Sequence, residues 1–169
     1  MRRIGFVLVV AICLAVLAPP VLERVPAFKQ SLTASANSAA SFPPGTIFTL
    51  TNSNFLEHFN VATPGVRLGS VSITGISPSE DIVGIDFRPA TGQLYGLASS
   101  SRLYVINVLT GVASPVNGGF TPLLDNAAFG FDFNPTVDRI RVVSTTEQNL
   151  RLHPDTGQTA GVDTNINPA

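Results

Sequence analysis

Two stretches of the chain decide its fold, GIDFRPATGQLYGL at residues 84–97 and GFDFNPTVDRIRVV at residues 130–143. Both place Gly, Asp, Phe and Pro at the same spacing, and the second follows the first by 46 residues. A Thr-Gly pair at residues 110–111 recurs at residues 156–157, again 46 residues later. Two matched features with one period indicate an internal repeat, which is typical of solenoids and propellers.

Each unit of the repeat is predicted to form four short β-strands. In the best copy, these strands are predicted at residues 81–89, 93–99, 102–108 and 112–116. The first turn, Pro-Ala-Thr-Gly, has Pro to preset φ and Gly to close the turn in a left-handed conformation. A further copy, FLEHFNVATPG at residues 55–65, ends 46 residues before Gly111. Four antiparallel strands in each unit of this length are typical of the blade of a β-propeller.

The folded body is therefore expected to be all-β, a partial β-propeller-like array of four-stranded antiparallel blades. Residues 46–169 provide about 2.7 units of 46 residues, whereas closed propellers contain about four to eight blades. An open array leaves an apolar face uncovered on its first and last sheets. We expect the chain to be truncated at its C-terminus, to self-associate through the open faces, or to fold its last strands back, and we favour truncation.

The N-terminal segment has the composition of a targeting signal. Arg2 and Arg3 precede an uncharged apolar run at residues 4–18, which is the pattern of a secretory signal. This run is shorter than the roughly 20 residues that span a bilayer, although an uncleaved anchor extended to Leu22 is the alternative. We predict an apolar signal helix, with residues 1–30 as a signal peptide or membrane anchor. The protein is then exported to the periplasm, the medium or the cell surface.

The composition of the chain after the N-terminal segment argues against several kinds of partner. Residues 31–45 are small and polar and are predicted to be a flexible linker. Residues 42–169 contain six arginines, no lysine and ten acidic residues, which argues against nucleic acid or an anionic membrane as partner. A membrane contact is expected only through the N-terminal segment, if that segment is uncleaved. The single cysteine, Cys13, excludes a disulfide framework and a cysteine-based metal site.

Asp86 and Asp132 occupy the same position in successive units. One interpretation is a ring of carboxylates around a channel, able to bind Ca²⁺ or to act as acid and base. The other is a structural aspartate that accepts backbone hydrogen bonds. Repetition favours the structural role, because a catalytic residue is needed once and a blade-building residue in every blade. We predict no cofactor, with Ca²⁺ as the alternative, and assign no catalytic residue.

Three arginines suggest a second kind of site. Arg139 and Arg141 alternate with apolar residues and so share one face of a predicted strand, and Arg151 lies on the next strand. This pattern fits a site for a small anion or for the carboxylate of a carbohydrate. A solvated strand face that discourages edge pairing is the alternative.

At GIDFRPATGQLYGL and GFDFNPTVDRIRVVSTTEQNLRLHPDTG the sequence resembles a bacterial secreted family, domain of unknown function 4394. The resemblance covers about residues 46–169 and implies propeller-type β repeats with no established activity. Members of the family usually have Gly where Glu147 lies, which implies a different loop in this chain. They also usually continue beyond the position of Ala169, which supports truncation.

These observations favour an extracytoplasmic, non-enzymatic protein that acts as a binding or surface-interaction module. One alternative is a propeller-type hydrolase or lactonase with a metal site at Asp86 or Asp132. The other is a non-functional fragment of a longer protein. An enzyme should carry unique polar residues at the channel end of one blade, whereas the sequence shows only repeated ones.

Overall fold

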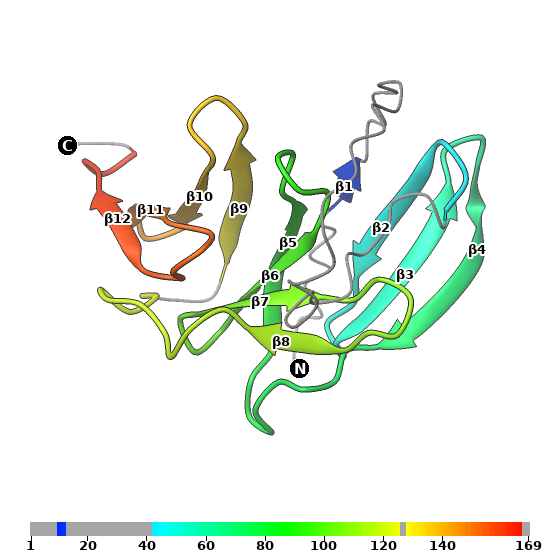
Figure 1. Ribbon diagram of the computed structural model, residues 1–169, viewed down its shortest axis with the longest axis horizontal. Helices are drawn as coiled ribbons and strands as arrows, with labels where there is room; N and C mark the ends of the chain where they lie inside the picture. The colour runs from blue at the N-terminus through cyan, green and yellow to red at the C-terminus, as the bar shows by residue number, and fades with distance from the viewer. Residues whose placement is uncertain (1–9, 13–41, 126–127, 167–169) are drawn as a thin grey trace, which may run out of the picture.

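The computed structural model describes residues 10–12, 42–125 and 128–166. Within these ranges the strands form three antiparallel four-stranded sheets that lie side by side (Figure 1). The N-terminal sheet contains β1 (Val10–Ile12), β2 (Thr46–Leu50), β3 (Phe55–Asn60) and β4 (Thr63–Ser72). The central sheet contains β5 (Ile82–Phe87), β6 (Leu94–Ala98), β7 (Arg102–Ile106) and β8 (Ala113–Pro115). The C-terminal sheet contains β9 (Phe129–Asn134), β10 (Arg139–Ser144), β11 (Asn149–Leu152) and β12 (Thr159–Val162).

The all-β prediction is confirmed, and the four strands predicted for the best copy are present as β5–β8. The predicted turn glycines Gly92, Gly111 and Gly157 have φ values of 69°, 74° and 65°, which a residue with a side chain adopts only with strain. Gly65, however, lies inside β4, so the expected third copy of this turn is absent. The described residues form an open array of sheets, and no closed propeller is seen among them. None of these residues forms a helix of the length and apolarity needed to cross a membrane.

The inner position of each sheet is held by β1, β5 and β9, with β5 in contact with both of the others. In the N-terminal sheet this position is held by Val10–Ile12, which pairs with β2. An open strand edge has unpaired backbone groups that an extended apolar segment can satisfy. These three residues are therefore a strand, and the remainder of the predicted signal helix lies outside the described residues.

Two apolar clusters hold the sheets together, one on each face of the central sheet. The first lies between the N-terminal and central sheets and includes Phe48, Leu56, Ile85, Leu94 and Tyr104. The second lies between the central and C-terminal sheets and includes Tyr95, Leu97, Phe131, Phe133 and Ile140. Every residue of β6 is buried, because this strand is covered on both faces. The inner strands also approach closely, since a Cβ atom on Gly84 would lie 2.7 Å from the Cβ of Phe131.

The outer face of the C-terminal sheet is polar, so the expectation of an apolar open face does not hold there. The central sheet buries Tyr95, Leu97, Leu103 and Val105 against the C-terminal sheet. One repeat of 46 residues later, the C-terminal sheet has Arg141, Val143, Asn149 and Arg151. The N-terminal sheet keeps more apolar exposure, at Phe55, Val66 and Leu68.

The turn between β10 and β11 contains a strained residue. Glu147 has a φ of 73°, and its N–H donates to the carbonyl of Ser144 at 3.1 Å. A left-handed backbone favours glycine, because a side chain crowds the neighbouring carbonyl. The resemblance implied Gly at this position, and the left-handed turn is a physical reason for that preference.

Candidate functional site

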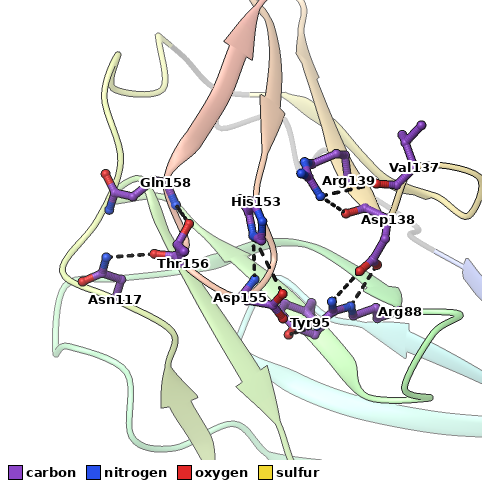
Figure 2. A network of polar contacts seen from close by, with 10 residues as sticks. All are labelled: Arg88, Tyr95, Asn117, Val137, Asp138, Arg139, His153, Asp155, Thr156 and Gln158. Carbon is purple, nitrogen blue, oxygen red and sulfur yellow. Dashed lines mark hydrogen bonds and ion pairs between the residues drawn. The ribbon is translucent and has the colours of Figure 1, made fainter.

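The outer face of the C-terminal sheet brings together the arginines singled out in the sequence. In the strand register, Arg141 of β10 lies directly opposite Arg151 of β11. Their side chains remain 40% and 46% exposed. Arg139 lies two residues before Arg141, but its guanidinium donates to the carbonyls of Val137 and Asp138 in the adjacent turn (Figure 2). We call Arg139, Arg141 and Arg151 the arginine face, and its central feature is the pair Arg141 and Arg151.

The arginine pair holds a carboxylate of the same chain, that of Asp163. Arg151 Nη2 donates to Asp163 Oδ1 at 2.8 Å, and Arg141 Nη1 donates to Asp163 Oδ2. The hydrogen bond from Arg141 lowers the pKa of Asp163, desolvation opposes this shift, and Arg151 adds to the lowering. Asp163 was missed in the sequence because nothing in its spacing from β10 and β11 marks it as their partner. Two arginines on neighbouring strands that share one carboxylate form the geometry of an oxyanion site.

The two repeated aspartates lie in different surroundings. Asp86 Oδ2 accepts the N–H of Phe133 at 2.7 Å, and Asp86 Oδ1 accepts the N–H of Phe87 at 2.8 Å. Asp86 therefore ties the inner strand β5 to the inner strand β9. Burial raises the pKa of Asp86, the N–H of Phe133 lowers it, and the adjacent carboxyl of Asp132 raises it further. Asp132 itself is exposed.

Metal ligation at these aspartates stays a prediction. No group of three or more His, Cys, Asp or Glu side chains within the described ranges is arranged to hold a metal ion. Asp86 and Asp132 form only a pair of neighbouring carboxyls.

Different effects are expected from removing these two side chains. Asp86→Ala should lower the free energy of unfolding by about 1–3 kcal/mol, because two part-buried N–H groups lose their acceptor. Asp132→Ala should change it by about 0.5 kcal/mol or less, because the side chain is exposed. Urea unfolding followed by circular dichroism measures both values. Equal losses in the two variants would show that Asp132 has the structural role of Asp86.

An ion-pair network around a buried arginine joins the central and C-terminal sheets. Arg88 is 7% exposed and follows β5 (Figure 2). It donates to Asp155 at 2.5 Å, to both carboxylate oxygens of Asp138, and to the hydroxyl of Tyr95 at 3.4 Å. The hydrogen bond with Asp138 is the main cause that raises the pKa of Arg88, and Arg88 in turn lowers the pKa of Asp138. All three nitrogen atoms of the guanidinium donate to groups of its own chain, and Arg88 acts as a structural clamp between the two sheets.

The hairpin between β11 and β12 presents Asp155 to this clamp. His153 Nδ1 accepts the N–H of Asp155 at 3.2 Å, and Asn117 Nδ2 donates to the carbonyl of Thr156 at 2.8 Å (Figure 2). The hairpin is thus held in place by His153, its own first residue, and by Asn117 of the loop after β8. His153 serves here as a turn residue, as Asn107 does one repeat earlier by accepting the N–H of Leu109.

A buried carboxylate, that of Glu80, fixes the loop before β5. Glu80 is 6% exposed and accepts hydrogen bonds from the Ser77 N–H at 2.9 Å, the Tyr104 hydroxyl at 2.6 Å and the Ser100 hydroxyl. Arg102 Nε lies 3.7 Å from Glu80 Oε1. All these partners belong to the central sheet or its loops, so the cluster is also structural.

Comparison with known proteins adds a matching family and one similar solved structure. Residues 55–169 match the family described as Domain of unknown function (DUF4394). No curated protein matches the sequence. Among solved structures, a protein of unknown function from Bacteroides caccae is similar, with 16% identity and a TM-score of 0.47. The match covers 71% of this chain and 42% of that one, so this chain spans less than half of that protein's length.

Proposed function

The chain belongs to the DUF4394 family, whose description assigns no activity, and we propose that this member is an exported, non-enzymatic binding module. It binds carboxylate-bearing ligands on the arginine face of its C-terminal sheet. The apolar run behind Arg2 and Arg3 supports export.

The observation that carries the proposal is the exchange of packing residues for arginines between successive units. Arg141 and Arg151 lie one repeat after Tyr95 and Val105, which pack against the neighbouring sheet. The exchange turns a packing face into two adjacent guanidinium groups on a rigid sheet. A guanidinium is planar and carries several donors, and it therefore suits the geometry of carboxylates.

The alternative of a hydrolase or lactonase is less well supported. Asp86, the partly buried aspartate of the inner strands, already accepts two backbone N–H groups. A catalytic acid or base needs a carboxyl within reach of its substrate. The hydrogen bonds of Asp86 favour its structural role and leave the arginine face as the better candidate site.

Calorimetric titration of the full chain tests the proposal. The probe is an oligomer of galacturonic acid, and a galactose oligomer of equal length is the neutral control. We expect the acidic oligomer alone to bind, with an affinity that falls as salt is added. The double variant Arg141→Gln, Arg151→Gln should weaken binding by about tenfold or more, since two charge-assisted contacts are lost.

Arg67→Gln provides the matched control. Arg67 is an exposed arginine of the N-terminal sheet and is also paired with a carboxylate, that of Glu57 at 2.6 Å. Its replacement removes one positive charge, against two in the double variant, and leaves the arginine face intact. Equal binding of acidic and neutral oligomers, or an equal loss in Arg67→Gln, would refute the proposal.

A further inference from the structure

Asp163 occupies the arginine pair as a ligand would. Its two carboxylate oxygens are divided between the two arginines, Oδ2 to Arg141 and Oδ1 to Arg151. The side chain is 26% exposed, so the bridge lies at the surface. A ligand carboxylate would find both guanidinium groups already engaged.

The backbone around Asp163 is anchored independently of its side chain. The Asp163 N–H donates to the carbonyl of Asn149 at 2.8 Å, and Asn149 Nδ2 donates to the carbonyl of Thr164 at 2.9 Å. These two bonds hold the segment after β12 against β11. The carboxylate can therefore rotate away from the arginines without release of the segment.

The two arginines also have contacts that do not involve Asp163. Arg141 Nη1 donates to Asn149 Oδ1 at 2.6 Å. A Cβ atom on Gly161 would lie 2.7 Å from Arg151 Nη2, so the Arg151 guanidinium lies directly over the β12 backbone. Both guanidinium groups would keep their places after Asp163 moved away.

We propose that Asp163 is a built-in competitor that masks a carboxylate site formed by Arg141 and Arg151. This inference rests on the proposed function, since it concerns the same face. A ligand carboxylate takes the place of the Asp163 carboxylate, which turns into solvent, and the charge of the site is unchanged by the exchange. Exposed ion pairs of this kind add little to stability, so the exchange is readily reversible.

The test compares Asp163→Asn with the wild-type full chain in titrations with the galacturonic acid oligomer. The apparent affinity equals the affinity of the open site multiplied by the fraction of protein in which the site is open, so masking by Asp163 weakens it. We expect Asp163→Asn to bind about five- to tenfold more tightly, because the amide competes weakly for the arginines. Glu57→Gln is the matched control, because it also removes a carboxylate that is paired with an arginine, on the N-terminal sheet. Its affinity should equal that of the wild type.

A second variant keeps the proposal testable if Asp163→Asn is poorly folded. Asp163→Ser also removes the carboxylate and keeps the anchored backbone N–H, and it should likewise bind about five- to tenfold more tightly than the wild type. The same titration with inorganic phosphate, in place of the oligomer, shows whether the open site prefers carboxylates. Phosphate that binds Asp163→Asn more tightly than the oligomer would overturn the carboxylate assignment.

The outcomes separate the two proposals. Wild-type affinity in Asp163→Asn, together with a loss in Arg141→Gln, Arg151→Gln, overturns the masking and leaves the binding function standing. Weaker binding by Asp163→Asn shows that Asp163 positions the arginines and also overturns the masking. Absence of binding by both the wild type and Asp163→Asn overturns the proposed function and the masking together.

Discussion

Glu80→Ala is expected to lower the free energy of unfolding by about 3–5 kcal/mol, the largest loss expected from a single polar substitution in this fold. The change removes the acceptor of the Tyr104 hydroxyl and of the Ser77 N–H. Tyr104 is only 2% exposed. Buried donors that lose their acceptor are costly, because water cannot reach them. Urea unfolding at neutral pH, followed by circular dichroism, measures the loss.

Glu80→Gln separates the charge from the shape of the side chain. Burial raises the pKa of Glu80, but the hydrogen bonds from Ser100, Tyr104 and Ser77 and the charge of Arg102 together lower it below its ordinary value. A lowered pKa stabilises the fold above the ordinary glutamate pKa of about 4.3, and this contribution is lost as the pH falls through the folded-state value. The stability difference between wild type and Glu80→Gln should therefore shrink as the pH falls below about 4.

The control for Glu80 is Glu57→Ala, which removes a carboxylate paired with the exposed Arg67. It should change the free energy of unfolding by about 1 kcal/mol or less. A comparable loss in Glu57→Ala and Glu80→Ala, or a pH-independent difference for Glu80→Gln, would contradict the role assigned to the buried cluster.

Arg88→Met is expected to lower the free energy of unfolding by about 2–3 kcal/mol and to loosen the C-terminal sheet first. The substitution keeps much of the side-chain volume but removes the clamp on Asp138 and Asp155. These carboxylates are 33% and 59% exposed, so water can solvate them, and the loss stays below that of a fully buried pair. Amide hydrogens of β9–β12 should exchange faster than those of the N-terminal sheet, because the two units are less tightly coupled.

Arg139→Met is the matched control for the clamp. It replaces an arginine of the C-terminal sheet whose guanidinium donates to the carbonyls of its own turn. The free energy of unfolding should change by about 0.5 kcal/mol or less. Uniformly faster exchange in all three sheets of Arg88→Met would show that Arg88 supports the whole fold and does not couple two units.

The candidate site was predictable only in part. Alternation along β10 placed Arg139 and Arg141 on one face, and the register with β11 brings Arg151 to Arg141. Alternation could not show that Arg139 turns back to its own loop or that Asp163 bridges the other two. The same limit applies to Asp86 and Asp132, which repeat in sequence but differ in burial, because Asp86 lies against β9 of the next sheet and Asp132 is exposed in the described structure.

The sequence by itself determined the all-β class, the four strands of the central sheet and the glycine turns at Gly92, Gly111 and Gly157. These features depend on contacts within one repeat unit, where alternation and turn chemistry act over a few residues. The tertiary structure alone decided which strand fills the inner slot of the N-terminal sheet, which faces are covered, and which charged groups meet. Arg88 finds its partners 50 and 67 residues away. Such pairs form only after one sheet docks on the next, and no local pattern encodes that docking.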